Sequence, residues 1–282
     1  MTHTKPVYSF EFFPPKTPEG ITKLAATSKM LAALQPRFFS VTFGAGGSTR
    51  DHTFETVLDL QKNTGIEAAP HLSCISSTRE NIRKALAAYQ EAGISHMVAL
   101  RGDMPSGMFE AGEFRYANEL VAFIREETGD HFHLEVAAYP EYHPQASSPD
   151  RDLANFKRKV DAGANSAITQ YFYNPDAYFR FVERCNSTGI DIPVVPGIMP
   201  ITNYNQLARF SDACGAEIPR WIRKRLEAYG EDTASIRAFG EEVVTNLCAQ
   251  LLRGGAPGLH FYTLNRAEPA LAIWNNLGLR SS

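Results

Sequence analysis

Short apolar runs alternate with amphipathic stretches along nearly the whole chain. The runs are rich in β-branched and aromatic residues and are bounded by glycine, proline and polar residues, a pattern that predicts strands. Eight such strands are expected, at residues 7–13, 38–43, 67–74, 96–102, 133–140, 166–173, 193–200 and 258–265. Between them, apolar residues recur at helical spacing, and in residues 80–92 one face carries Ile82, Ala85, Leu86 and Tyr89.

The ends of the amphipathic stretches carry residues typical of helix boundaries. Thr78 is a candidate N-cap for the helix at 80–92, and Gly93 follows its end, as Gly163 follows the helix predicted at 153–162. The regular alternation of strands and helices predicts an α/β fold with a parallel sheet. Eight units favour a single closed (β/α)8 barrel of the TIM type, and an open, doubly wound sheet is the alternative.

Three further helices, at residues 203–214, 219–229 and 233–253, are predicted between the seventh and eighth strands, where they could cover the mouth of the barrel. The length of 282 residues suits one barrel of roughly 250 residues. No repeat, low-complexity tract or linker interrupts the pattern. Residues 1–282 are therefore expected to form a single catalytic domain.

Composition narrows the class of protein. A net charge of −3 and the absence of any basic block argue against a nucleic-acid partner. Four cysteines, Cys74, Cys185, Cys214 and Cys248, lie far apart without a C-x-x-C pair, which argues against a structural zinc site or a disulfide framework. No apolar run of about 18 residues predicts a membrane span, and no signal peptide is evident. These features indicate a soluble, cytoplasmic protein.

Polar residues at the carboxyl ends of the predicted strands are the candidates for chemistry, because that end of a β/α barrel holds the active site. They are Glu11, Thr42, His71, Arg101, Gly102, Asp103, Tyr139, His143, Gln170, Tyr262, Asn265 and Arg266. No lysine lies at the immediate end of a strand, which disfavours a Schiff-base aldolase.

Glu11 is a candidate proton donor. Alternation along its strand places the carboxylate on the face opposite Phe10 and Phe12. Partial desolvation favours the protonated form of such a carboxylate, which suits general acid catalysis near neutral pH. A structural carboxylate paired with an arginine is the alternative.

Two other motifs suggest ligand contacts. In the triplet Arg101-Gly102-Asp103, the glycine would let the backbone approach a flat ligand closely, and a salt-bridged loop is the alternative. His71 and His143 belong to none of the H-x-H, H-x-x-E-H or H-E-x-x-H spacings, so we expect no metal site. Each histidine is interpreted as a hydrogen-bond donor to an anionic or heteroaromatic ligand, or as a buried imidazole.

The helix at 153–162 and the residues just before it carry a polar cluster. Asp152, Asn155, Arg158 and Lys159 are three or four residues apart and share neighbouring parts of one helical surface. They could bind an extended polar cofactor, or they could form a solvated ion-pair face. The glycine-rich residues 44–48 fit no phosphate-binding pattern and are interpreted as a turn.

Several motifs together resemble the bacterial 5,10-methylenetetrahydrofolate reductase family. They are SFEFFPP at 9–15, SVTFGA at 40–45, APHL at 69–72, ALRGD at 99–103, VAAYPEYHP at 136–144, KRKVDAGAN at 157–165 with Gln170 beyond it, and HFYTLNRAE at 260–268. The resemblance spans nearly the whole chain. Phe43 departs from it, since many relatives have tyrosine there.

The resemblance implies a barrel that holds FAD non-covalently and reduces 5,10-methylenetetrahydrofolate to 5-methyltetrahydrofolate with electrons from NADH or NADPH, in a ping-pong hydride relay that supplies methionine synthesis. It also implies a homo-oligomer. Glu11 would be the general acid, and Asp103 would lie beside the flavin and the pterin, where its negative charge strengthens the reduced flavin as a hydride donor.

The same resemblance assigns binding residues. FAD contacts would be Phe43, Ala45, His71, Arg101, Gly102, Asp103, Ala117, Tyr139, His143, Ala146, Asp152, Asn155, Arg158 and Lys159. Thr42 and Gln170 would contact the nicotinamide. The folate would meet Asp103, Gln170, Gln206, Phe210, Tyr262 and Arg266, with Phe210 as a stacking residue.

Two other classes compete with this interpretation. One is a different flavin or pterin barrel, such as a proline-dehydrogenase-like oxidoreductase or a folate methyltransferase. The other is a non-catalytic binding protein. Glu11 and the nicotinamide residues argue against the first class, and the presence of both Glu11 and Asp103 argues against the second.

Overall fold

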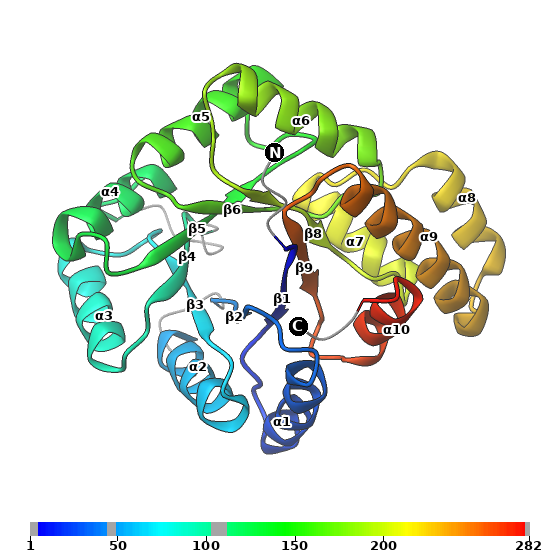
Figure 1. The fold of residues 1–282 in the computed structure, drawn as a ribbon, viewed down its shortest axis with the longest axis horizontal. Coiled ribbons are helices and arrows are strands. Elements are labelled where there is room, and N and C mark those ends of the chain that lie inside the picture. Colours follow the sequence, from blue (N-terminus) through cyan, green and yellow to red (C-terminus); the bar gives the residue numbers. More distant parts are fainter. Residues whose placement is uncertain (1–4, 44–48, 103–111, 280–282) are drawn as a thin grey trace.

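A computed structural model describes residues 5–43, 49–102 and 112–279 of the protein, and it shows a ring of parallel strands surrounded by helices (Figure 1). The strands are β1 (Val7–Phe12), β2 (Phe38–Val41), β3 (Ala68–Ser73), β4 (His96–Leu100), β5 (His133–Ala138), β6 (Ser166–Thr169), β7 (Val194–Val195), β8 (Gly197–Ile198) and β9 (Gly258–Tyr262). Their order in the sheet is β7-β6-β5-β4-β3-β2-β1-β9-β8, with parallel pairing throughout. The predicted barrel is confirmed.

The strand predicted at 193–200 is divided in two. β7 pairs with β6, whereas β8 pairs with β9. Pro196 lies between them; it has no N–H to donate, but its carbonyl accepts a 3.0 Å hydrogen bond from the N–H of His260. Because β7 and β8 are separated by this one residue, the pair connects β6 to β9 and closes the ring.

The helices lie on the outside of the ring (Figure 1). They are α1 (Pro18–Ala32), α2 (Thr49–Thr64), α3 (Arg79–Glu91), α4 (Ala117–Thr128), α5 (Pro149–Asp161), α6 (Pro175–Ser187), α7 (Tyr204–Cys214), α8 (Arg220–Tyr229), α9 (Thr233–Arg253) and α10 (Glu268–Asn276). The three helices predicted between the last two strands are confirmed as α7, α8 and α9. The predicted cap is also confirmed, since the side chain of Thr78 accepts a hydrogen bond from the N–H of Asn81. In the described part of the chain, no helix is long and apolar enough to cross a membrane.

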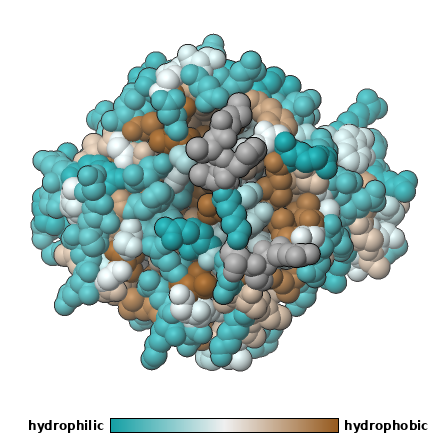
Figure 2. Space-filling model, in the orientation of Figure 1, coloured by the Kyte–Doolittle hydropathy of each residue, from teal (hydrophilic) through white to brown (hydrophobic). Residues whose placement is uncertain are grey.

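Strand side chains alternate between the two faces of the ring. Phe10 and Phe12 point outward and are almost completely buried, where they contact the ring of Phe39. The opposite faces of the strands form an interior layer that contains Phe38, Ala69, Val98 and Ile168. Hydrophilic side chains cover most of the molecular rim seen in Figure 2, as expected for amphipathic helices with outward polar faces.

Candidate active site

A cavity of about 420 Å³ lies at the carboxyl ends of the strands, within the range of small-molecule sites. Six of the residues predicted from the sequence line it, namely Glu11, His71, Tyr139, Gln170, Phe210 and Tyr262. They come from β1, β3, β9, α7 and the segments after β5 and β6. Folding thus brings together side chains that are far apart in the sequence.

Apolar residues that sequence reasoning missed form much of the cavity wall. They include Val98, Leu100, Ala137, Ile168, Met199 and Leu264. Alternation along the strands could have identified Leu100 and Ala137, because Leu100 lies two residues beyond the inward-facing Val98 and Ala137 two residues beyond the inward-facing Glu135. The cavity is therefore an apolar slot with a few polar groups, a form that suits a flat ring system.

A second cavity of about 390 Å³ adjoins the first and shares Phe210, Tyr262 and Leu264 with it. Gln206 and Arg266, both predicted from the sequence, line this outer cavity. A ligand with a ring in the inner cavity could therefore extend a polar part toward Gln206 and Arg266.

Glu11 faces two histidines inside the barrel. Its Oε2 lies 3.4 Å from Nε2 of His71 and 3.6 Å from Nε2 of His260, and its side chain is 18% exposed. Phe10 and Phe12 point away from it, as predicted. Among the described residues no arginine forms an ion pair with Glu11, so the alternative of a Glu–Arg pair finds no support there.

The two histidines differ in their surroundings. Burial lowers the pKa of His71 to about 4, although the charge of Glu11 opposes the shift. His71 is therefore neutral at physiological pH. His260 is completely buried, and its Nδ1 lies 2.7 Å from Oγ of Ser9. The other ring nitrogen of His260, Nε2, is the one that faces the Glu11 carboxylate.

The backbone of Glu11 is anchored to the segment after β9. The Thr263 hydroxyl donates a 2.6 Å hydrogen bond to the Glu11 carbonyl. Asn265 bonds both the N–H and the carbonyl of Phe13 through its side chain, at 3.0 and 2.9 Å. Leu264 and Asn265 adopt left-handed φ angles of 49° and 56°, which cost about 1–2 kcal/mol for a residue such as leucine. Local strain thus accompanies the positioning of Glu11 and of Leu264 in the cavity wall.

A hydrogen-bonded network links several residues of the predicted cofactor set. Arg101 donates through Nη2 to Oε1 of Gln145 at 2.7 Å, and the N–H of Gln145 donates to Nδ1 of His143 at 3.0 Å. The N–H of His143 in turn donates to Oδ2 of Asp152. The Tyr139 and His143 rings meet edge to face, with centroids 4.6 Å apart. The segment after β5 is thereby tied to both β4 and α5.

The polar residues of α5 divide between two environments. Arg158 is exposed and donates to Oδ1 of Asn155 at 3.2 Å. Lys159 instead donates to the carbonyl of Ala137 in β5. Burial lowers the pKa of Lys159 to about 8, against the opposing charge of Asp152. Of these two cations, Arg158 is therefore the one that faces solvent and is accessible to a bound anion.

Gly102 occupies a position that requires glycine. Its φ is +84°, and a Cβ there would lie 1.9 Å from Oγ of Ser73. That hydroxyl donates to the Arg101 carbonyl at 2.9 Å. The backbone after β4 is therefore packed directly against β3.

The remaining predicted residues that the structure describes lie outside both cavities. Thr42 and Phe43 follow β2 and are half-buried, Ala117 begins α4, and the N–H of Ala146 donates to the His143 carbonyl. Ala45 and Asp103 lie outside the described residues.

The fold and the position of these cavities define a β/α-barrel protein with a candidate active site at the carboxyl ends of its strands. A family model for methylenetetrahydrofolate reductase matches residues 1–278. The 5,10-methylenetetrahydrofolate reductase of Pectobacterium carotovorum subsp. carotovorum is 44% identical over 273 residues, which cover 96% of this chain and 90% of the relative. The enzyme of Escherichia coli K12 is 43% identical over 272 residues, with the same coverage. The chain therefore belongs to the methylenetetrahydrofolate reductase family and is an oxidoreductase.

A plant relative and two solved structures extend the comparison. A rice protein described as a probable methylenetetrahydrofolate reductase (NADH) is 42% identical over 97% of this chain, which spans only 48% of that protein. A Clostridium thermocellum protein described as binding two copies of 5-methyl-5,6,7,8-tetrahydrofolic acid has a TM-score of 0.69 at 16% identity, covering 96% of this chain and 94% of its own. A 3-dehydroquinate dehydratase from Geobacillus kaustophilus has a TM-score of 0.54 at 12% identity, covering 98% and 91%. These two structures show the barrel fold alone.

Proposed function

We propose that the chain reduces 5,10-methylenetetrahydrofolate to 5-methyltetrahydrofolate with electrons from NADH or NADPH passed through non-covalently bound FAD, in two half-reactions at one site. The observation that carries this proposal is the Glu11 carboxylate, placed in an apolar cavity with Gln170 and Tyr262 in its lining. An acid in such a cavity suits protonation of a flat heteroaromatic substrate. Residues 1–282 would act as one catalytic domain.

The residues around the cavity fit FAD. Gly102 lets the backbone pack directly against Ser73, which fixes the turn after β4 that carries Arg101. Arg158 offers an exposed guanidinium that would offset a diphosphate charge. Arg101, Tyr139 and His143 supply a cation and two rings that contacts through Gln145 and between the rings connect. Bound FAD would supply the two-electron step between nicotinamide and folate.

Each half-reaction would use particular side chains of the chain. Thr42 and Gln170 would orient the nicotinamide. Gln170 would also bond the pterin of the folate, and the aromatic ring of Phe210 would stack on it. Gln206 and Arg266, in the adjoining cavity, would bind the polar remainder of the folate.

Glu11 would donate the proton that opens the five-membered ring of the folate. His71 is neutral, so it would not add a positive charge beside Glu11. The hydrogen bond from the Thr263 hydroxyl to the Glu11 carbonyl would hold the carboxyl group at one position. Asp103 would add a negative charge beside the flavin, which disfavours an anionic reduced flavin.

Separate measurement of the two half-reactions tests this proposal. Purified protein is mixed with NADH without oxygen, flavin bleaching is followed, and methylenetetrahydrofolate is then added to restore the flavin bands. We expect Glu11→Gln to keep flavin reduction and to slow reoxidation by the folate at least about 100-fold, because only the second step needs the proton donor. Glu19→Gln, an exposed carboxylate on α1 paired with Lys23, is the matched control and should behave as wild type.

Two results would contradict the proposal. If Glu11→Gln slowed both half-reactions equally, the residue would not be the acid of the folate step. If the wild-type protein bound no FAD, the cofactor assignment would be wrong.

A further inference from the structure

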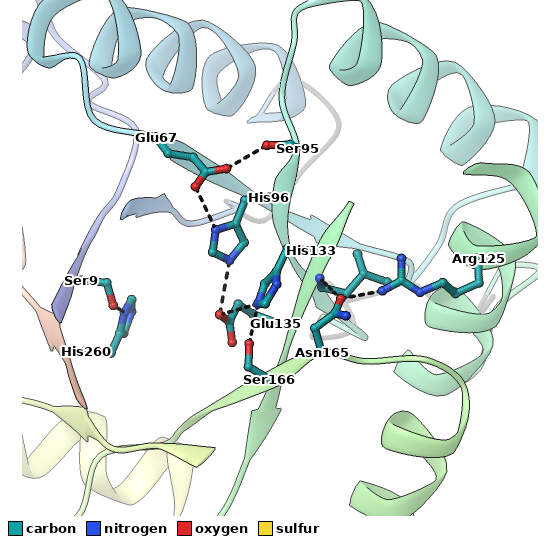
Figure 3. Close-up of polar contacts among 11 residues, drawn as sticks. Ser9, Glu67, Ser95, His96, Arg125, His133, Glu135, Asn165, Ser166 and His260 are labelled. Carbon is teal, nitrogen blue, oxygen red and sulfur yellow. Dashed lines mark hydrogen bonds and ion pairs between the residues drawn. The ribbon is translucent and has the colours of Figure 1, made fainter. Parts of the chain in front are cut away.

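A second cluster of titratable side chains lies at the other end of the barrel, near the amino ends of β4 and β5 (Figure 3). Nε2 of His96 is 3.3 Å from Oε1 of Glu135, and Nε2 of His133 is 3.4 Å from the same oxygen. The side chains of His96 and Glu135 are each 5% exposed, whereas that of His133 is 48% exposed. The interior layer with Phe38, Val98 and Ile168 lies between this cluster and the cavity described above.

The two distances from Glu135 to the histidines match those between two ligands of one metal ion. A charge-assisted N–H···O bond is about 2.7–2.9 Å long. Two ligand atoms on a tetrahedral zinc ion, with bonds of about 2.0–2.2 Å, are separated by roughly 3.3–3.6 Å. The two separations from Oε1 of Glu135 fall in the second range. All three potential ligand atoms lie within 4.8 Å of one another.

Glu135 also has an unsatisfied oxygen. Its Oε2 is buried and has no hydrogen-bond partner among the described residues. A buried carboxylate oxygen normally has a hydrogen-bond donor or a cation beside it. A divalent cation next to Oε1 would offset this charge.

A second carboxylate, that of Glu67, faces the other ring nitrogen of His96. Oε2 of Glu67 lies 3.7 Å from Nδ1 of His96, and the Ser95 hydroxyl donates to Oε1 of Glu67 at 2.9 Å (Figure 3). Histidines that bind metals commonly interact through their other ring nitrogen with a carboxylate, which fixes the ring and directs a lone pair at the ion.

A proton is the rival occupant of this position. Burial lowers the pKa of His96, but its interactions with the carboxylates of Glu135 and Glu67 outweigh that effect and leave it raised. An imidazolium at His96 would compensate the two carboxylates, but it would not explain why His133 faces the same oxygen. Oγ of Ser166 lies 2.7 Å from Nε2 of His133, within hydrogen-bonding distance; metal binding would displace this contact.

We propose that His96, His133 and Glu135 bind a divalent transition-metal ion, with zinc as the preferred ion, at the amino-terminal end of the barrel. Two imidazoles and one carboxylate leave a fourth position for water, and the half-exposed His133 gives the ion access from solvent. The site would tie β4 to β5. It departs from the expectation of no metal, which rested on the spacing around His71 and His143.

Cobalt binding tests this site independently of folate reduction. The purified protein is treated with a chelator and titrated with Co²⁺, whose tetrahedral complexes absorb strongly in the visible range; difference spectra are recorded at wavelengths beyond the flavin bands. We expect one Co²⁺ per chain, displaced by one equivalent of Zn²⁺. His133→Ala and Glu135→Gln should each raise the Kd for Co²⁺ more than about 10-fold, since even the loss of an outer partner costs 10- to 100-fold.

His52→Ala is the matched control, because His52 forms an exposed pair with Glu55 at 3.7 Å on α2. It should bind Co²⁺ as wild type does. His133 is half-exposed, so its variant keeps the test valid even if Glu135→Gln unfolds. The proposal is overturned if wild type shows no tetrahedral Co²⁺ spectrum, or if His133→Ala binds Co²⁺ with unchanged affinity.

Discussion

The hydroxyl of Tyr262, at the end of β9, donates a 2.7 Å hydrogen bond to the main-chain carbonyl of Thr169 at the end of β6. The Tyr262 side chain packs closely on Gly197 of β8. A Cβ at Gly197 would lie 2.7 Å from the nearest atoms of Tyr262. The hydrogen bond thus links β9 to β6 directly, at the place where the two-residue strands β7 and β8 close the barrel. It also fixes a side chain shared by both cavities.

Loss of this hydroxyl should destabilise the barrel. We expect Tyr262→Phe to lower the free energy of unfolding by about 1–3 kcal/mol, because the Thr169 carbonyl loses its donor in a buried setting. Tyr229→Phe removes a surface hydroxyl that accepts from exposed Arg225 and should change stability by less than about 0.5 kcal/mol. Urea unfolding of both variants checks the difference, and equal effects would contradict the bracing role.

Alanine substitutions at Gly102 and Gly65 distinguish the cost of steric crowding from the cost of backbone strain. Both have positive φ, +84° and +72°, but a Cβ at Gly65 would meet nothing within 4 Å, whereas one at Gly102 would collide with Ser73. Gly65→Ala should therefore cost about 1–2 kcal/mol from backbone strain alone. Gly102→Ala should cost more and should also weaken FAD binding. Chemical unfolding and flavin titration provide the two readouts, and similar losses in both variants would show that the space beside Ser73 is not restrictive.

His71 should make the protein sensitive to acid. Its pKa in the folded state, about 4, lies below the usual 6.5, so the unfolded state binds the proton more readily. The stability that this residue contributes is complete above pH 6.5 and is lost as the pH falls toward 4, by on the order of 3 kcal/mol. His71→Asn should therefore flatten the dependence of unfolding free energy on pH in this window.

The exposed His52→Asn variant serves as the control for that measurement and should keep the wild-type slope. If His71→Asn and His52→Asn lost stability equally on acidification, another group would be responsible for the acid sensitivity.

Phe210 should matter for substrate binding and little for folding. It is 38% exposed on α7 yet lines both cavities. Phe210→Ala should raise the KM for the folate roughly 2- to 10-fold, the equivalent of about 0.5–1.5 kcal/mol of ring contact, with a small change in Tm. Trp221→Ala, an exposed aromatic on α8, should leave the KM unchanged. Steady-state kinetics and thermal unfolding check both expectations, and an unaltered KM in Phe210→Ala would remove this residue from the folate site.

Local patterns in the sequence were sufficient to predict the elements. Strands and amphipathic helices bury their apolar faces with periods of two and 3.6 residues, so their order and approximate bounds could be predicted before any packing was known. The division of the seventh strand at Pro196 could not. It depends on which neighbour each half pairs with, and that is a property of the closed sheet.

The sequence by itself determined the barrel, the inward direction of Glu11 and, through the motifs that resemble the reductase family, six of the residues that line the inner cavity. Only the tertiary structure decided that His71 and His260 converge on Glu11, that Lys159 turns to the barrel wall while Arg158 faces solvent, and that His96 and His133 share one oxygen of Glu135. The physical reason is that strand alternation specifies a face and a height, whereas contact between side chains of different strands depends on the register and closure of the whole barrel.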